Sequence, residues 1–291
     1  MITVIGDLVV DLLISSDDTN YATDTESTIK TLPGGQANHV AAWINEGGHP
    51  CTLIGRIGND FYGGFLQEDL QKLGVKQSIE KDTVVETGKI AILIDALNGE
   101  RSMYTDRGAN KNLSIDQIKR SEGTIRNSDC LYISGYSLFG ETTYEAGLHA
   151  QSIAQRYQVP IAFDPSSTYF LEKYNERVMA FLKGVDFFFP NLDEARLLTQ
   201  EQQPGAIMEK LQSLVKYPVL KMGDNGCLIF DDGKLLHIPA EKVDVMDTTG
   251  AGDSFIGTFL ATFFRNHELN KAAIQATKIA ANTVGQIGGR P

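Results

Sequence analysis

The sequence has few cysteines and no long apolar run. Its 291 residues include three cysteines, Cys51, Cys130 and Cys227, which lie far apart and form no Cys-x-x-Cys pair. A disulfide framework and a zinc ribbon are therefore poor interpretations. No apolar run approaches the roughly 20 residues of a membrane helix. Asp7 and Asp11 interrupt the apolar start of the chain, which argues against a signal peptide. We expect a soluble, cytoplasmic protein.

The sequence also has fewer basic than acidic residues. The chain has 26 Lys and Arg against 37 Asp and Glu, which gives a net charge of −11. Nucleic acids and anionic membranes select basic surfaces, so neither is the expected partner. A locally positive site for a phosphorylated small molecule stays compatible with this charge.

Several common motifs are missing as well. No Gly-Lys-Ser/Thr ending of a phosphate loop is present, and only Gly6 stands where a dinucleotide fingerprint would follow the first strand. Ser134 and Ser137 lie in no nucleophile elbow. The histidines have no metal-ligand spacing, so we assign them no catalytic role; they are His39, His49, His149, His237 and His267.

Short apolar runs alternate with helical patterns, which predicts an α/β fold with a mainly parallel sheet covered on both faces. The turns Asn225-Gly226 and Asp232-Gly233 predict that this sheet ends in antiparallel strands. The expected strands are Thr3–Ile5, Thr52–Ile54, Cys130–Ile133, Ile161–Phe163, Phe187–Phe189 and Val219–Met222. The expected helices are Asn38–Asn45, Phe61–Leu73, Thr143–Tyr157 and Ala206–Val215.

Two stretches break this alternation. Ile90–Leu97 and Arg101–Thr105 flank Asn98-Gly99, which predicts a hairpin with a type I′ turn. Leu8–Ile14 and Glu26–Thr31 form a second candidate pair of strands. We therefore expect a single domain over residues 1–291, with a small antiparallel sheet within about residues 8–32 and 88–107.

The segment Asp247-Thr-Thr-Gly-Ala-Gly-Asp253 carries the strongest chemical signal. An apolar stripe at helical spacing follows it, so Gly250-Ala251-Gly252 opens a helix whose first N–H groups can bind an anion. Asp253 lies in that first turn, where it can accept a proton from a hydroxyl that attacks a phosphate. The alternative is that the glycines only shape a turn and Asp253 only stabilises the helix dipole.

A second segment, Pro33-Gly34-Gly35-Gln36-Ala37-Asn38, places two glycines just before a helix. The glycines allow close approach of a polyhydroxylated ligand, and the Asn38 amide offers it a donor and an acceptor. The alternative is an ordinary loop before a helix start.

With these two segments the sequence resembles the ribokinase-like carbohydrate kinases, also called the phosphofructokinase B family. Gly34-Gly35 to Asn38, followed by Gly47-Gly48, looks like the N-terminal family signature, and Asp247–Asp253 matches the C-terminal one. The resemblance covers essentially the whole chain. Further matching segments are Gly6-Asp7 to Asp11, Gly108-Ala109-Asn110, Phe163-Asp164-Pro165, Pro190–Glu194 and Gly223–Gly226. The resemblance implies a three-layer α/β/α sandwich with a small β-sheet lid.

The resemblance also implies the activity and its machinery: an ATP-dependent kinase that transfers the γ-phosphoryl group to a sugar hydroxyl. By this analogy Asp253 is the general base, and the backbone N–H groups of Gly250, Ala251 and Gly252 form the anion hole. The residues expected to bind the sugar are Asp11, Gly34, Gly35, Asn38 and Arg107.

The same analogy assigns the cofactors. Asn191 and Glu194 would organise Mg²⁺ through water, and Asp247 and Thr249 would lie beside a monovalent-cation site for K⁺. The expected nucleotide-binding residues are Asn191, Lys221, Gly223, Asp224, Gly226 and Asn282. A solvated surface position is the alternative for Lys221. Members of the family often form homodimers through the lid, and we carry this over as an expectation.

The acceptor stays open among ribose, fructose and keto-deoxy sugars. Gly34-Gly35 to Asn38 is one residue shorter than the usual family spacing. Arg107 suits the carboxylate of an acid sugar, but Asp164-Pro165 is followed by Ser-Ser-Thr-Tyr rather than by the Arg of 2-keto-3-deoxygluconate kinases. Two alternatives remain. One is a nucleoside kinase with Tyr104, Tyr136 and Phe139 around the base, and the other is a catalytically inactive sugar-binding relative.

Overall fold

The structure is a computed structural model that describes residues 1–16, 20, 22–95 and 101–291. In these residues the larger sheet has nine strands in the order β13-β12-β11-β10-β9-β8-β1-β4-β5. Neighbouring strands from β5 to β11 are parallel, whereas β12 and β13 are antiparallel, which confirms the predicted sheet. The strands are β1 (Ile2–Ile5), β4 (Cys51–Gly58), β5 (Lys76–Asp82), β8 (Cys130–Ser134), β9 (Ile161–Asp164), β10 (Phe187–Phe188), β11 (Tyr217–Lys221), β12 (Cys227–Asp231) and β13 (Lys234–Ile238).

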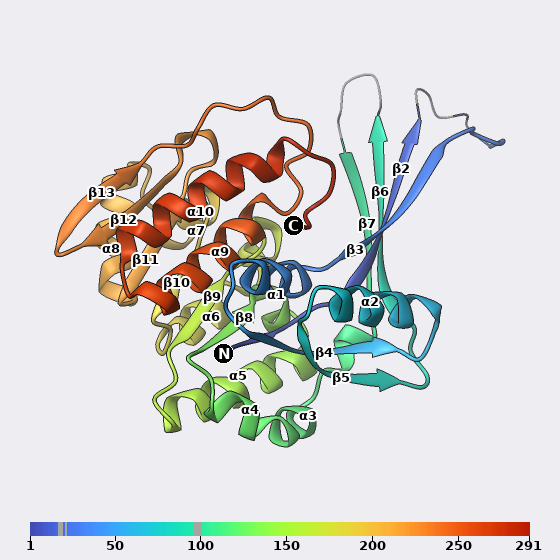
Figure 1. The fold of residues 1–291 in the computed structure, drawn as a ribbon, viewed down its shortest axis with the longest axis horizontal. Coiled ribbons are helices and arrows are strands. Elements are labelled where there is room, and N and C mark those ends of the chain that lie inside the picture. Colours follow the sequence, from blue (N-terminus) through green and yellow to red (C-terminus); the bar gives the residue numbers. More distant parts are fainter. Residues whose placement is uncertain (17–19, 21, 96–100) are drawn as a thin grey trace.

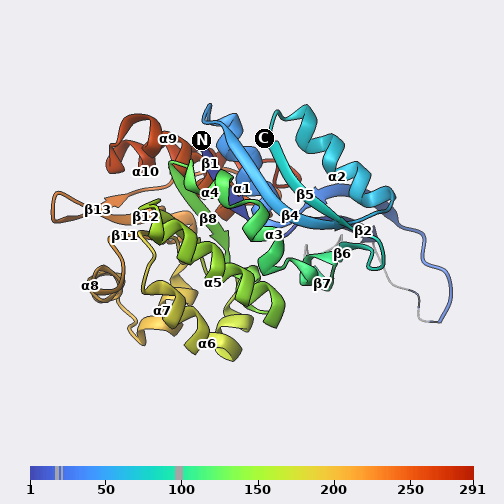
Figure 2. The same ribbon diagram turned by 90° about the horizontal axis from the view of Figure 1, so that it is seen from below.

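Helices cover both faces of this sheet, and Figure 2 shows it between the two helix layers. One layer consists of α1 (Gln36–Glu46), α2 (Phe61–Lys72), α9 (Ala251–Asn266) and α10 (Leu269–Val284). The other consists of α3 (Ile115–Arg120), α4 (Glu122–Arg126), α5 (Glu141–Arg156), α6 (Thr168–Leu182), α7 (Leu192–Thr199) and α8 (Pro204–Leu214). Among the described residues, no helix has the length and apolar character that crossing a bilayer requires.

The strands read as continuous apolar runs because both of their faces are buried. In β8, Cys130 and Tyr132 join the apolar cluster under α1 and α9, whereas Leu131 and Ile133 join the cluster under α5 and α6. Successive side chains of a strand point to opposite faces, so one short run supplies both cores. Three-layer packing follows directly from this pattern.

The smaller sheet has the order β3-β2-β6-β7 and extends beyond the body of the protein (Figure 1). Its strands are β2 (Val9–Ser16), β3 (Thr28–Gly34), β6 (Thr87–Asp95) and β7 (Arg101–Gly108). The pairs β2–β3 and β6–β7 are antiparallel as predicted, but β2 and β6 are parallel to each other because both leave the body in the same direction. We call this sheet the lid. The predicted Asn98-Gly99 turn lies outside the described residues.

Several helices and strands have sequence patterns too weak to predict. β5 has the polar sequence Lys-Gln-Ser-Ile-Glu-Lys-Asp, typical of an edge strand, and therefore has no apolar run. α6 is interrupted by a non-helical residue at Tyr174, which obscures its periodicity. The short 3₁₀ helices η1 (Ala109–Asn112), η2 (Gly135–Leu138) and η3 (Gly223–Asn225) were likewise not predicted.

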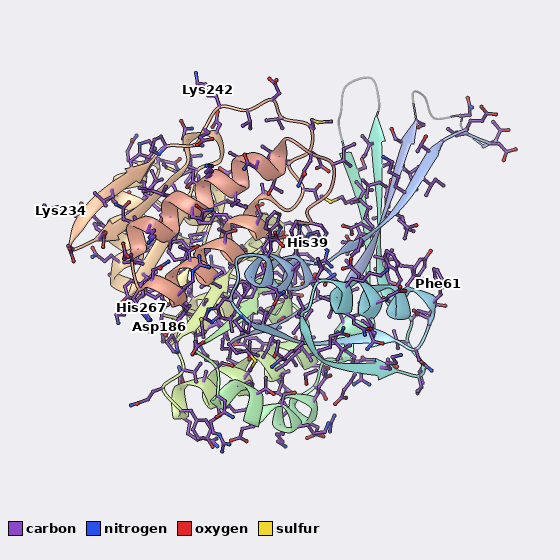
Figure 3. All side chains as sticks on the ribbon, viewed as in Figure 1. His39, Phe61, Asp186, Lys234, Lys242 and His267 are labelled. Carbon is purple, nitrogen blue, oxygen red and sulfur yellow. The ribbon has the colours of Figure 1, made fainter. Side chains whose placement is uncertain are left out.

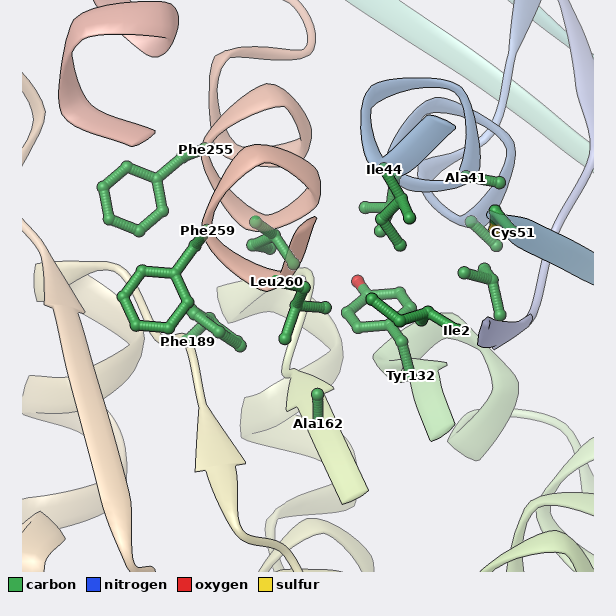
Figure 4. Packing of buried hydrophobic residues seen from close by; sticks show 14 of the residues in the cluster. Ile2, Ala41, Ile44, Cys51, Tyr132, Ala162, Phe189, Phe255, Phe259 and Leu260 are labelled. Atoms are coloured by element: carbon green, nitrogen blue, oxygen red, sulfur yellow. The ribbon is translucent and has the colours of Figure 1, made fainter. Parts of the chain in front are cut away.

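Aromatic packing fixes α9 on the sheet, as Figure 4 shows for Phe255, Phe259 and Leu260. Phe259 is fully buried and meets Phe189 edge to face, with ring centroids 5.2 Å apart. Edge-to-face pairs add to the free energy of area burial. This packing holds the helix, and therefore also its N-terminus, against the carboxyl ends of the strands.

We expect Phe259→Ala to lower the free energy of unfolding by about 3–5 kcal/mol, because it leaves a cavity between α9 and β10. Denaturant unfolding measures the loss. Phe61→Ala is the control, since Phe61 is 82% exposed on the outer side of α2 (Figure 3); its effect should stay within about 0.5 kcal/mol. Equal losses for the two variants would contradict the assignment of this core.

Candidate active site

The predicted site residues gather at the edge of the larger sheet where its parallel strands end. Ser134, Asp164 and Lys221 are the last residues of β8, β9 and β11, and Asp7 follows β1. Helices α1, α7 and α9 begin near the same edge. In open α/β sheets, the crevice outside the carboxyl ends of the strands is the usual ligand site.

Helix α9 begins at a tightly packed glycine. Gly250 has a φ of 73°, and a Cβ added there would lie 2.3 Å from Gly289 Cα. No side chain caps this N-terminus, so its partial positive charge is available to an anion. The N–H of Ala251 has an internal acceptor, Thr248 O, at 3.3 Å, so one of the three predicted donors already has a partner.

Asp253 lies in the first turn of α9 and is half-buried. Burial, and after it the negative charge of Asp164, raises the pKa of Asp253 well above its ordinary value, whereas Lys221 acts in the opposite direction. A carboxylate with a raised pKa is a stronger base, and this suits a group that takes a proton from a hydroxyl.

Lys221 is not a solvated surface lysine, so that alternative is wrong. Its ammonium forms an ion pair with Asp164, and the side chains are 15% and 2% exposed. Burial alone lowers the pKa of Lys221, but Asp164 and Glu194 outweigh it and the pKa is raised. Lys221 Nζ also lies 3.4 Å from the position of a Cβ on Gly252. A fixed positive charge therefore stands beside the first turn of α9.

Asp164 also connects this cation to α1. Gln36 Nε2 donates to Asp164 Oδ1 at 2.9 Å, and the Ser166 N–H donates to the same oxygen at 2.7 Å. Gln36 Oε1 in turn accepts from Ser134 Oγ at 2.6 Å. These bonds fix the carboxylate on both sides, so the orientation of Lys221 depends on three strand ends at once.

Asn191 and Glu194 form a capping box at the start of α7. Glu194 N donates to Asn191 Oδ1 at 2.9 Å, and Asn191 N donates to Glu194 Oε2 at 2.8 Å. Burial, together with the charge of Asp164, raises the pKa of Glu194 to about 7. The two side chains therefore stabilise the start of α7. The buried Glu194 carboxylate also lies beside the negative charge of Asp164, so a cation bound there would stabilise its ionised form.

This donor set fits a magnesium ion that keeps most of its water. Among the described residues, no group of three or more His, Cys, Asp and Glu is arranged to hold a metal ion. Mg²⁺ in phosphate-binding sites is typically held by one or two carboxylates together with water and substrate phosphates. Glu194 contributes one carboxylate oxygen that lies outside the capping box.

The remaining predicted cofactor residues lie around the loops that flank α9 and α10. Asp247 is buried; its Oδ1 accepts from Thr249 N at 2.7 Å and its Oδ2 from Gly288 N at 2.9 Å. The carboxylate thus ties the loop before α9 to the segment after α10. Asn282 is exposed near the end of α10.

Gly223, Asp224 and Gly226 surround the short turn η3 between β11 and β12. This turn directly follows Lys221 and Met222, so any ligand seated on it also approaches the Lys221–Asp164 pair. Predicted nucleotide contacts and the fixed ammonium therefore lie on one continuous stretch of chain.

The acceptor residues enclose two buried oxygens that have no partner in the described part of the chain. Asn38 is fully buried; its Nδ2 donates to Gly34 O at 2.9 Å, and its Oδ1 has no hydrogen-bond partner. Asp11 Oδ1 is likewise without a partner. A Cβ on Gly34 would lie 2.3 Å from that oxygen, and Gly35 has a φ of 100°. The bond to Gly34 O uses one of the two Nδ2 hydrogens, and Asn38 Oδ1 is left as a buried acceptor.

Arg107 already has an anionic partner within the protein. Its Nη1 donates to Asp7 Oδ2 at 2.6 Å, and its guanidinium lies over the Tyr136 ring, 3.7 Å from the centroid. Arg107 is the last side chain of lid strand β7, so these contacts attach the lid to the ends of β1 and β8. The side chain that was expected to meet a substrate carboxylate is engaged by Asp7.

The model of the pfkB family of carbohydrate kinases matches residues 1–291 of this sequence. The chain belongs to this family. Adenosine kinase from Dictyostelium discoideum is 27% identical over 270 residues, 86% of this chain and 78% of that protein. Ribokinase from Bacillus subtilis is 25% identical and covers 100% of this chain and 96% of its own length.

A solved structure shares the fold. A protein from E. coli described as a ribokinase II, crystallised with ATP and Mg²⁺, superposes with a TM-score of 0.90 at 24% identity, covering 99% of this chain and 94% of that one. The ribokinase-like fold predicted from the motifs is thus confirmed. As a pfkB family member, the protein is a phosphotransferase that acts on a sugar or nucleoside hydroxyl.

Three residues of this pfkB kinase site were not predicted from the sequence. The sequence motifs contain Asp164 and Asp7 but indicate no partner for either, and Arg290 lies in none of these motifs. Arg290 Nη2 donates to Asp69 Oδ2 at 2.6 Å and Nη1 to Asn38 O at 3.0 Å. Asp7 and Asp164 each follow a predicted strand, and this position is the one sequence signal that indicates a site residue there. No local sequence pattern indicates a role for Arg290.

Residues 288–290 pack against α1. Gly289 O accepts from Trp43 Nε1 at 2.9 Å and lies 2.8 Å from His39 Nδ1. His39 lies near the centre of the molecule (Figure 3), and burial lowers its pKa to about 4. The buried, neutral ring thus joins α1 to the C-terminal segment through Gly289.

An aromatic cavity of about 280 Å³ adjoins the acceptor residues. Tyr136, Phe139 and Phe170 line it together with Asp7 and Arg107. Phe139 and Phe170 stack with ring centroids 4.8 Å apart. Two of the three aromatic residues predicted for a nucleoside base therefore line a cavity. The third, Tyr104, is 66% exposed on the lid and lies outside it.

Burial of the Asp11 carboxyl makes the stability of the fold depend on pH. Burial, and then Asp7, raises its pKa to about 7, whereas an unfolded Asp titrates near 3.9. The folded protein therefore retains a proton that the unfolded chain releases, and the stability from this group, present below about pH 4, is lost as the pH rises towards 7. Asp11→Asn cannot ionise and should avoid this loss.

We expect Asp11→Asn to melt a few degrees above the natural protein at pH 8 and at the same temperature at pH 4, because each pKa unit corresponds to about 1.4 kcal/mol. Thermal melts across this pH range measure the difference. Asp244→Asn, at an exposed position, is the control and should show no pH-dependent gain. A variant less stable than the natural protein at both pH values would contradict the assigned burial cost.

Proposed function

We propose that this protein is an ATP-dependent kinase that transfers the γ-phosphoryl group of ATP to a hydroxyl of a small sugar, with Asp253 as general base. The observation that carries the proposal is the position of Asp253. It lies in the uncapped first turn of α9, beside the fixed ammonium of Lys221. A base and two sources of positive charge thus meet where a phosphoryl group can be transferred.

Asp253 takes the proton from the acceptor hydroxyl as its oxygen attacks the γ-phosphorus. The raised pKa of this carboxyl brings its basicity closer to that of the reacting hydroxyl in the transition state. The N–H groups of Gly250 and Gly252 and the helix dipole stabilise the charge that spreads over the phosphoryl oxygens. The Ala251 N–H joins them when it exchanges its 3.3 Å bond to Thr248 O for a phosphoryl oxygen. Lys221, although paired with Asp164, holds its ammonium on the same side.

The nucleotide lies along the turn Gly223–Gly226 and reaches Asn191 and Asn282. Asn191 and Glu194 would hold Mg²⁺ through water, and the ion would supply positive charge to the phosphates. The loop around Asp247 and Thr249, tied to Gly288, is the proposed K⁺ site.

The acceptor occupies the space in front of Asp11 and Asn38, whose unpartnered oxygens accept hydrogen bonds from its hydroxyl groups. Gly34 and Gly35 leave room for the sugar, and Arg107 closes one side. The lid covers the bound acceptor and excludes water, which otherwise competes for the phosphoryl group. Exposed Ile29, Met103 and Tyr104 on the lid are compatible with the predicted homodimer, which remains a prediction.

A nucleoside is the second candidate acceptor, and the aromatic cavity specifically favours it. A purine ring stacks well on aromatic side chains, and the cavity beside Arg107 and Tyr136 is large enough for one. The similarity to an adenosine kinase supports this candidate, whereas the similarity to a ribokinase supports the sugar.

A coupled ADP-release assay over pentoses, hexoses, keto-deoxy acids and nucleosides, with and without K⁺, tests the proposal. Turnover on a sugar is the expected result. Turnover on nucleosides alone would select the second candidate. Tight sugar binding in calorimetry without any turnover would instead support the catalytically inactive relative.

We expect Asp253→Asn to lower kcat by about 10²–10⁴-fold, since it removes the general base while preserving shape. ATP affinity, measured by calorimetry, should stay within about threefold because the base acts mainly in the transition state. The acid limb of the kcat profile of the natural enzyme should lie well above pH 4, as the raised pKa of Asp253 requires.

Exposed Asp224 is not a suitable control, because it belongs to the proposed nucleotide turn. Asp232→Asn, in the distant turn between β12 and β13, is the matched variant and should retain full activity. An Asp253→Asn enzyme with more than a tenth of the natural kcat would remove the general-base role.

A further inference from the structure

Three cations beside the site residues each have a carboxylate partner. Arg107 is paired with Asp7 at 2.6 Å, Lys221 is paired with Asp164, and Arg290 is paired with Asp69 at 2.6 Å. The side chains of these three cations are at most 19% exposed. Pairs this well shielded from solvent are screened little by salt, so each cation is neutralised locally.

Three more acids face the same space. Asp11, Asp253 and Glu194 form no ion pair with any residue in the described part of the chain. Asp7 and Asp253 are close enough to interact, as are Asp11 and Asp7. The cleft wall therefore carries more negative than positive charge before any ligand binds. A second anion on the acceptor side meets repulsion unless a cation is released for it.

We propose that Asp7, by holding Arg107, restricts the acceptor to uncharged sugars or nucleosides and rejects acid and phosphorylated ones. This inference rests on the proposed function and names the substrate class of the same site. Asp7 is a specificity-determining residue: it keeps the Arg107 guanidinium, which lines the aromatic cavity, from serving as a carboxylate or phosphate receptor.

Arg107 cannot turn to an anionic acceptor without cost. Its guanidinium lies 3.7 Å from the Tyr136 ring centroid, which fixes its plane, and Asp7 is 5% exposed. If Arg107 left, Asp7 would remain buried without its ion pair, a costly arrangement. From the residues that the structure describes, only long contacts would remain to the carboxylate, from Ala37 N at 3.4 Å and Ser134 Oγ at 3.3 Å.

The other cation of the cavity does not replace Arg107. Lys111 lines the cavity but is 64% exposed and paired with Asp106 at 3.1 Å. An exposed lysine is strongly hydrated and gives no bidentate recognition of a carboxylate. Past Asp164-Pro165, the chain continues with Ser166 and Ser167, so no guanidinium is supplied from that side.

The test is a gain of function. In Asp7→Asn the amide keeps its shape while Arg107 is set free. We expect binding of 2-keto-3-deoxygluconate and of ribose 5-phosphate, measured by calorimetry without ATP, to tighten at least tenfold. The ratio of kcat/KM for 2-keto-3-deoxygluconate over that for ribose or fructose should rise by a similar factor. Asp7→Ser serves as a second variant should the first fail to fold.

Two controls separate the pair from a general change in charge. Asp106→Asn also removes one negative charge near the cavity but frees only Lys111, so its gain should stay below threefold. The double variant Asp7→Asn with Arg107→Met should lose the gain of the single one. Equal gains in Asp7→Asn and Asp106→Asn would overturn the proposal, as would a natural enzyme that prefers an anionic acceptor.

The outcomes also distinguish this inference from the proposed function. If the natural enzyme turns over neutral sugars or nucleosides but Asp7→Asn gains nothing for anions, only the inference fails. If no acceptor is phosphorylated at all, the proposed function fails. In that case the calorimetric comparison of anion binding still supports or overturns the role of Asp7.

Discussion

The ion pair between Lys221 and Asp164 is the contact on which the rest of the site depends. It joins the ends of β9 and β11 and holds an ammonium 3.4 Å from the Cβ position of Gly252. Asp164 also binds Gln36 of α1, the helix that carries Asn38. One buried carboxylate thus couples the phosphate side of the cleft to the acceptor side, and a displaced Asp164 would disturb both.

The buried carboxylates of the site destabilise the folded protein. Asp11, Asp253 and Glu194 all have raised pKa values, for which burial is the first cause. Such groups lower the free energy of unfolding at neutral pH, and the aromatic core beneath α9 offsets this cost. The same burial makes Asp253 a stronger base, so catalytic capacity and reduced stability have one physical origin.

The sequence predicted most of what is local and little of what is long-range. The helix start at Gly250–Asp253 and the strand runs follow from spacing within a few residues. The pairs Lys221–Asp164, Arg107–Asp7 and Arg290–Asp69 join residues 57, 100 and 221 positions apart. Hydrophobic periodicity along the sequence does not predict ion pairs between residues so far apart. Arg107 and Lys221 were therefore interpreted as ligand-facing or solvated, whereas both have partners within the chain.

The most direct test of this account is to compare Lys221→Met with Lys221→Arg in turnover and nucleotide affinity. A fixed charge at the transferred phosphoryl group predicts that Lys221→Met loses at least 100-fold in kcat while its ADP affinity stays within about threefold, because the charge acts mainly in the transition state. Lys221→Arg should recover part of the rate. A Lys221→Met enzyme with nearly natural turnover would contradict the account.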